Sequence, residues 1–160
     1  MAIAASTLQT TISEKVTLNG VTYGNTITKT FTGVKEVRQS VITVPTSEKL
    51  LYTTLGTLAT DGSAAAELDH DLIKYARIKN CDTTNFINLL LENEAGDEFM
   101  YKVNAGTSFL LSNHADCMEA TTAGADVTIG TYASTTAIKN VSASANTASV
   151  DIELFIAIGT

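Results

Sequence analysis

LIKYARIKN (residues 72–80), NFINLLLE (85–92) and EFMYKV (98–103) are three apolar runs, separated by the polar turns CDTT (81–84) and NEAGD (93–97). In the first run alternate residues fall on opposite faces, with Leu72, Ala76 and Ile78 on one side and Tyr75 on the other. Because successive side chains of a strand point to opposite faces, this alternation predicts β-structure. The three runs predict consecutive strands joined by tight turns.

The same pattern extends to both ends of the chain. Residues 10–18 alternate and end at Asn19-Gly20, the strongest short hairpin signal, after which a second alternating run reaches Phe31. Thr32-Gly33 is expected to break this run. A further run covers residues 34–44 and ends at Pro45, a strand exit. Residues 142–149, rich in Ala, Ser, Asn and Thr, are expected to face solvent. Residues 150–158 form a last run that alternates in its first half and loses the alternation in its second half, where both faces are expected to be covered. We count eight to ten short strands with turn signals every 8–12 residues and no helix–strand alternation, which predicts one all-β domain, a sandwich or barrel.

Composition supports sheet and argues against two classes of partner. Threonine occurs 26 times in 160 residues, and its branched side chain suits a pleated surface. Charged residues make up only 17% of the chain, and the net charge is −7. A protein that binds nucleic acid or an anionic membrane directly would gather Lys and Arg on one face, but ten basic residues are scattered here. We therefore expect neither partner.

Two short clusters have the residue types of a site. Asp69-His70-Asp71 could bind a metal or supply a base, and His114, Asp116 and Cys117 could form a nucleophilic pair or recruit zinc. Adjacent strand residues diverge, so we interpret the first cluster as a solvated polar stretch before Leu72.

Other chemical signals are weaker. The acidic residues Glu92, Glu94, Asp97 and Glu98 are expected at a solvated hairpin tip, since no calcium-binding spacing surrounds them. No nucleophile elbow or phosphate-binding loop is present, and Cys81 and Cys117 are expected to be partly buried free thiols. We predict no enzyme activity, no catalytic residues, no cofactor and no metal.

The central segment resembles small structural proteins of tailed bacteriophages. The likeness covers roughly residues 72–112: YARIKN (75–80), then Asp82, NFINL (85–89), an acidic turn and AGTSF (105–109). Those proteins are β-sandwich or jelly-roll modules that serve as capsid decoration (cement) proteins or as tail and fibre components. The resemblance therefore implies an antiparallel, jelly-roll-like β-sandwich and a virion component assembled in the host cytoplasm.

On this basis we expect a decoration protein that binds the outer face of a phage head shell, as a homotrimer contacting the major capsid protein or other virion proteins. The sandwich is expected over residues 10–160, with residues 1–9 as an N-terminal arm. Ala2, Ile3, Ala4 and Ala5 are the candidate subunit or shell contacts, because this start is too apolar for a free tail. The alternatives are a tail or head–tail connection ring protein and a β-sandwich module that binds a host receptor or glycan.

Overall fold

A computed structural model describes residues 6–54, 66–112, 118 and 137–159. This part of the chain consists of strands and one short 3₁₀ helix, and all strand pairs but one are antiparallel. The prediction of an all-β, antiparallel chain is confirmed. The elements are β1 (Ser6–Ser13), β2 (Val16–Leu18), β3 (Val21–Tyr23), β4 (Thr26–Val44), β5 (Lys49–Thr53), β6 (Ala66–Glu67), η1 (His70–Leu72), β7 (Ile73–Asn80), β8 (Ile87–Asn93), β9 (Glu98–Val103), β10 (Ser108–Leu111), β11 (Ile138–Ala145) and β12 (Val150–Gly159).

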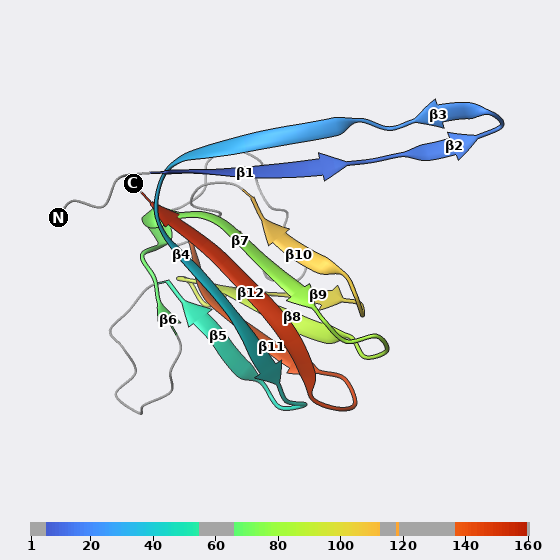
Figure 1. The fold of residues 1–160 in the computed structure, drawn as a ribbon. Helices are drawn as coiled ribbons and strands as arrows, with labels where there is room; N and C mark the ends of the chain where they lie inside the picture. The colour runs from blue at the N-terminus through green and yellow to red at the C-terminus, as the bar shows by residue number, and fades with distance from the viewer. Residues whose placement is uncertain (1–5, 55–65, 113–117, 119–136, 160) are drawn as a thin grey trace, which may run out of the picture.

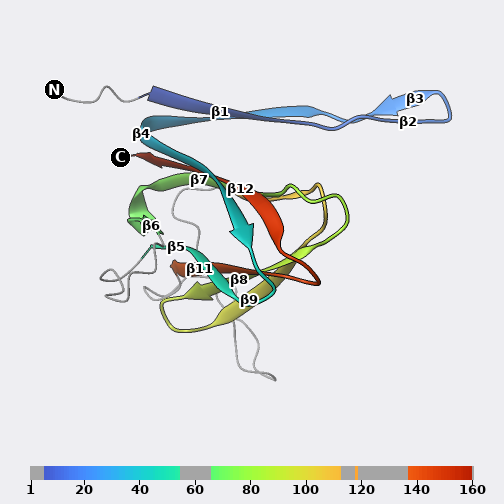
Figure 2. The same cartoon turned by 60° about the horizontal axis from the view of Figure 1, so that its bottom comes forward.

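Two five-stranded sheets contain all of these strands except β2 and β3. The first has the order β1-β4-β12-β7-β10, and the second has the order β6-β5-β11-β8-β9. Within them the chain pairs from its ends inward: β4 with β12, β5 with β11, β7 with β10, and β8 with β9. Figures 1 and 2 show these eight strands as one body, from which the paired β1 and β4 and the β2–β3 hairpin extend to one side.

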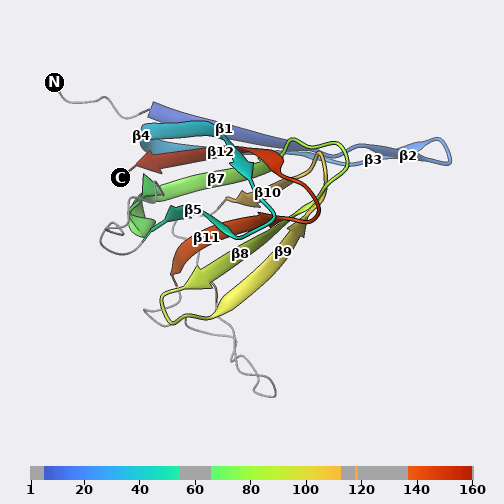
Figure 3. The same ribbon diagram turned by 90° about the horizontal axis from the view of Figure 1, so that it is seen from below.

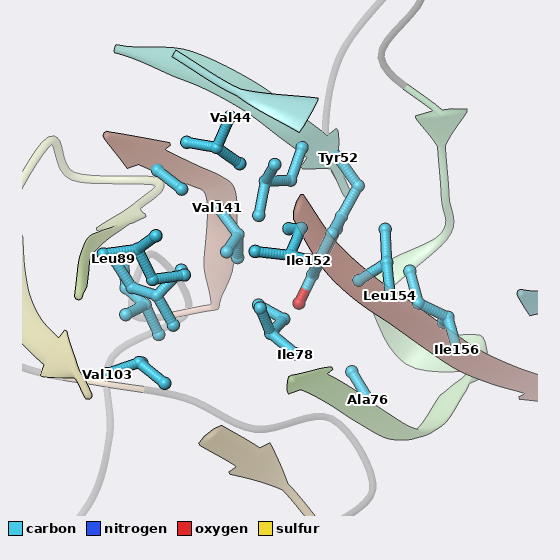
Figure 4. Close-up of a cluster of buried hydrophobic side chains, with 14 of the residues drawn as sticks. Val44, Tyr52, Ala76, Ile78, Leu89, Val103, Val141, Ile152, Leu154 and Ile156 are labelled. Carbon is cyan, nitrogen blue, oxygen red and sulfur yellow. The ribbon is translucent and has the colours of Figure 1, made fainter. Parts of the chain in front are cut away.

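The core lies between the two sheets, and β12 shows how sequence creates it. Ile152, Leu154 and Ile156 alternate with Glu153 and Phe155, and the even-numbered side chains are at most 4% exposed. They meet apolar side chains of the second sheet (Figure 4). Burying a branched aliphatic side chain is worth about 1.5–3 kcal/mol, so this alternation fixes which face of β12 points inward. The largest fully buried members of the cluster are Tyr52, Ile78, Ile87, Leu89, Ile152 and Ile156.

The three central strands and the Asn19-Gly20 turn are confirmed. Two expectations were wrong. A break was expected at Thr32-Gly33, but β4 runs through it as a single 19-residue strand. Residues 142–149 were expected to face solvent; residues 146–149 are exposed, but β11 extends to Ala145 and buries Ser142, Ala143 and Ala145. Small polar and apolar side chains fit there because β11 lies centrally in its sheet, between β5 and β8.

A close backbone contact sets the direction in which β4 leaves the body. Residues 26–34 of β4 pair with β1, and residues 34–44 pair with β12. At the junction Gly33 has φ 75°, and a Cβ on Gly159 would lie 2.0 Å from the Gly33 carbonyl oxygen. Only glycine accommodates both conditions without displacing one of the strands. The junction therefore separates β4 into an arm half and a body half.

Asn80, fully buried at the end of β7, holds the following turn. Its side-chain amide donates to the carbonyl oxygens of Asn85 (2.9 Å) and Val103 (3.2 Å), and its oxygen accepts from the Asp82 N–H. Asp82 in turn accepts from the backbone N–H groups of Asn85 and Thr84, which hold the pKa of its carboxyl below the usual range. The polar turn expected at residues 81–84 is thus fixed by a buried amide.

Replacing Asn80 with Ala should lower the free energy of unfolding by about 2–4 kcal/mol, because Ala leaves buried backbone groups without partners. Urea denaturation of the purified variant measures the loss. Asn88→Ala is the matched control, since Asn88 is partly exposed on β8, the next strand along the chain, and it should change stability by less than about 0.5 kcal/mol. Equal effects of the two substitutions would contradict the role of Asn80.

Candidate functional site

The Asp69-His70-Asp71 cluster folds as a capped 3₁₀ turn. The Asp69 carboxylate accepts a hydrogen bond from the Asp71 N–H, and the η1 turn follows. His70 is 8% exposed, whereas the Asp71 side chain is 86% exposed, with 3.5 Å between His70 Nδ1 and Asp71 Oδ1. The expectation of a uniformly solvated stretch is therefore wrong for His70. The turn points His70 inward because the chain enters β7 only at Ile73.

His70 lines a small cavity together with apolar neighbours. Its walls also include Tyr52, Ile73, Leu111 and Ile138. The cavity measures about 20 Å³, which is room for roughly one water molecule. A pocket of this size holds no organic substrate, since ligand pockets typically measure about 300–1,000 Å³. His70 thus lies in a packed apolar setting rather than beside a substrate site.

The remaining chemical candidates do not converge within the described residues. Glu92 and Glu98 pair across the β8–β9 hairpin, and Asp97 accepts a 2.9 Å hydrogen bond from Asn93. The hairpin expected at residues 93–97 is confirmed. No group of three metal-ligating side chains occurs among the described residues. His114, Asp116 and Cys117 lie outside it. Cys81 is exposed, so the expectation that it is partly buried was wrong.

The most distinctive described surface is a long hairpin, residues 6–33, which we call the arm. Cross-strand partners in it keep one register from Leu8–Phe31 to Leu18–Val21. The Glu14 N–H donates to the Asn25 oxygen (2.8 Å) and joins the two parts of the ladder. At the tip Asn19 (φ 50°) and Gly20 (φ 79°) form the two-residue turn. The arm is therefore one continuous ribbon.

The two faces of the arm differ in chemistry. Partners directly across a ladder share a face. The pairs at alternate positions are mostly apolar: Leu8–Phe31, Ile12–Ile27, Val16–Tyr23 and Leu18–Val21, with Thr10–Lys29 and Glu14–Asn25 between them. The intervening pairs carry hydroxyls, which contact each other across the strands at Thr11–Thr28 (3.2 Å), Ser13–Thr26 (3.1 Å) and Thr17–Thr22 (3.2 Å). The arm thus has an apolar face and a Thr/Ser face.

Only the base of the apolar face is covered. Phe31 is 6% exposed and packs on Tyr75, with ring centroids 5.9 Å apart, and Tyr75 contacts Phe155 at 6.0 Å. Burial raises the pKa of Tyr75, although the Arg77 charge opposes the shift. Leu8 packs against the same cluster. This cluster attaches the arm to the outer face of the first sheet.

Beyond the base, all side chains of residues 11–30 are exposed. Figures 1 and 3 show the β2–β3 end extending past the body, where no described strand lies against it. Fully covering the apolar side chains here, now half exposed, would contribute about 5–10 kcal/mol. An isolated two-stranded ribbon is marginally stable in water. The arm therefore has the features of a surface that is completed by a partner. Its large apolar side chains are Ile12, Val16, Leu18, Val21, Tyr23 and Ile27, between 52% and 61% exposed.

The sequence placed the interaction surface elsewhere. Ala2, Ile3, Ala4 and Ala5 lie outside the described residues, and residues 6–9, expected in the N-terminal arm, belong to β1. Residues 10–31 were read as ordinary strands. The signal that could have identified the arm is the pairing of two alternating runs of equal length around Asn19-Gly20. Burial, which alternation alone does not report, distinguishes an exposed ribbon from a core hairpin.

A second, smaller group of exposed apolar side chains lies on β9. Phe99, Met100 and Tyr101 are 44–66% exposed, and the Tyr101 ring lies 5.0 Å from Phe109 of β10. Phe99 and Tyr101 share the core side of their sheet with Val103, at the edge where the two sheets diverge. The chain that follows β10 lies largely outside the described residues, so the arm is the better-defined surface.

Comparison of the chain with protein-family models, with curated proteins and with solved structures found no match. Among the residues described, no helix has the length and apolar character needed to cross a bilayer.

Amide hydrogen exchange in dilute solution should separate the arm from the body. We expect the amides of β2 and β3 to be protected by about two orders of magnitude less than those of β12, because local opening of a ribbon costs far less than global unfolding. The β1 amides near Leu8 should be intermediate, since the aromatic cluster holds the base. Equal protection of β2 and β12 in a monomeric sample would contradict an uncovered arm.

Proposed function

We propose that this chain is a non-enzymatic structural protein of a virion, and specifically a capsid decoration (cement) protein that binds the outer face of a phage head shell. We further propose that its eight body strands form a sandwich of the jelly-roll type. The observation that carries the proposal is the combination of this body with an arm whose apolar face has no cover in the described chain.

The pairing of the strands supports a jelly roll. Counted along the chain, the body strands are β4, β5, β7, β8, β9, β10, β11 and β12. First pairs with last, second with seventh, third with sixth, and fourth with fifth. A long hairpin wrapped on itself has this pattern, which is that of the eight-stranded jelly roll, a frequent architecture of viral capsid and lectin domains. Because folds host many functions, the pattern raises the prior for a virion role and does not by itself establish one.

The surfaces support assembly over catalysis. The cavity beside His70 is too small for a substrate, and the titratable clusters among the described residues face solvent or are held in turns. The arm instead offers an apolar strip that contributes about 5–10 kcal/mol when covered. Association itself costs about 4–15 kcal/mol, so one arm contact is weak and several are needed for a stable assembly. A protein that attaches many copies to a repeating shell meets this condition.

A tail or head–tail connection ring is the second candidate, because a projecting arm can also link neighbours around a ring. Oligomer mass separates the two: a trimer favours decoration, and a hexamer or dodecamer favours a ring. The sheet faces and hairpin tips contain no tryptophan for sugar stacking, so a glycan-binding module has less support.

Labelling of intact particles of the virus that encodes the chain tests the proposal. A gold-conjugated antibody raised against the purified protein should decorate the whole head surface, because a cement protein occupies every repeat of the shell. Labelling confined to one vertex would favour the tail or head–tail connection ring over capsid decoration. Absence of the protein from purified particles, or labelling of host-cell surfaces by the purified protein alone, would overturn a virion structural role.

A further inference from the structure

We propose that Asn19, at the tip of the arm, is a site of spontaneous modification. Its side-chain amide is lost to water by way of a cyclic imide that forms with the Gly20 nitrogen. Opening of the β2–β3 tip sets the rate of this reaction. The inference concerns the chain alone and does not depend on what covers the arm, so it stands or fails separately from the proposed virion role.

Asn19 has the most reactive local surroundings of the asparagines in the chain. Asn19-Gly20 is the only Asn-Gly pair in the sequence. The attacking nitrogen belongs to a residue without a side chain, so no Cβ shields it from the Asn19 amide carbon. Both residues are exposed, and within the described chain neither the Gly20 N–H nor the Asn19 side chain has a hydrogen-bond partner. Water and base therefore reach both reacting groups.

The reaction needs no reagent other than water. The Gly20 nitrogen gives its proton to solvent and attacks Cγ of Asn19, so that an N–Cγ bond forms. The Cγ–Nδ2 bond then breaks, and the leaving nitrogen takes up a proton and departs as ammonia. Water opens the imide at one of its two carbonyl groups, which yields aspartate or isoaspartate. No atom is oxidised or reduced at any step.

The folded turn itself holds the reacting groups apart. Positive φ angles at both Asn19 and Gly20 define a type I′ turn. Such a turn is the mirror image of type I and has a ψ of about +30° at its first central residue. At that angle the Gly20 nitrogen lies on the opposite side of the Asn19 Cα–C bond from Cβ, so the imide ring closes only after this bond rotates. Rotation breaks the Leu18–Val21 pairing, and the reaction therefore proceeds from the opened tip.

The tip is a segment that opens at low cost. Only three cross-strand pairs join Val16–Leu18 to Val21–Tyr23, and all of these side chains are exposed. No described strand lies against the β2–β3 end in the three ribbon views (Figures 1, 2 and 3). Local opening of such a ribbon costs far less than opening of the core. Asn80 and Asn93, in contrast, are fully buried and hydrogen-bonded, so the core must open before they react.

The two products change the arm in different ways. Aspartate preserves the hairpin, because Asp-Gly is also a favoured pair in type I′ turns. It takes the net charge of residues 6–33 from +1, the balance of Lys15 and Lys29 against Glu14, to zero. Isoaspartate instead routes the main chain through the side chain of residue 19 and adds one carbon atom to it. A two-residue turn does not accommodate that atom, so isoaspartate breaks the pairing at the end of the apolar face.

Ageing of the purified, folded protein at neutral pH tests the site. Trypsin releases the peptide 16–29, which contains both Asn19 and Asn25, and fragmentation in a mass spectrometer locates the lost amide. Asn19 should react roughly tenfold faster than Asn25, because the branched side chain of Thr26 shields the nitrogen that would attack Asn25. Unfolding the chain in guanidinium chloride should speed the reaction at Asn19 by roughly tenfold or more, since no opening step is then required.

The variant Asn19→Asp is the matched control, because it carries one product from the start and has no amide to lose. Its β2 and β3 amides should exchange with solvent as those of fresh wild type do, whereas the isoaspartate fraction of aged protein should lose protection there and keep it in β12. Reaction at Asn25 as fast as at Asn19, or an Asn19 that stays intact in the folded chain after the unfolded chain has reacted fully, would overturn the site. Equal rates at Asn19 in folded and unfolded protein would overturn control by tip opening.

Discussion

The structure depends on β4, a single strand that is shared between the arm and the two-sheet core. Residues 34–44 of β4 pair with β12 as part of the two-sheet core, whereas residues 26–34 pair with β1 in the arm. The two halves meet where a Cβ on Gly159 would collide with the Gly33 carbonyl and where Gly33 itself has a positive φ of 75°. Because the strand is continuous, the core fixes the direction of the arm. The Phe31–Tyr75–Phe155 contacts then hold its base against the sheet.

Apolar residues that follow the same alternating pattern have different roles in β12 and in the arm. In β12 alternating Ile and Leu side chains are buried between sheets and supply stability. In the arm the same alternation, at Ile12, Val16 and Leu18, faces solvent and supplies nothing to the isolated chain. A large exposed apolar surface lowers solubility. Such surfaces are typical of interaction sites rather than of the free surface of a monomer. The Thr/Ser face on the other side limits the exposure to one side of the ribbon.

The sequence alone predicted the class of fold and much of the strand order. Alternation in residues 72–80 and in the first half of 150–158 located two central strands, and Asn19-Gly20 located the hairpin turn, because these signals are local. Burial was predicted poorly where it depends on sheet position: residues 142–145 read as polar and small, yet β11 lies between two strands and buries them. The burial of His70 was predicted wrongly because the sequence pattern indicated an extended chain, whereas a 3₁₀ turn points the side chain inward. The arm was missed as a site because periodicity reports which residues share a face and not what covers that face.

The positions of the polar and apolar side chains bear on the proposed assembly role. Several polar side chains of the described residues stabilise the fold. Asn80 and Asn93 are fully buried and hold turns, and Arg77 and Glu153 form an ion pair on the outer sheet face. Such groups are positioned by neighbours on both sides and have little freedom to serve a reaction. Among the described residues the arm has the longest exposed apolar face, which is continuous with a packed cluster at one end and open at the other. A surface of this kind gains free energy only when another surface covers it, which is the property that the proposed assembly role requires.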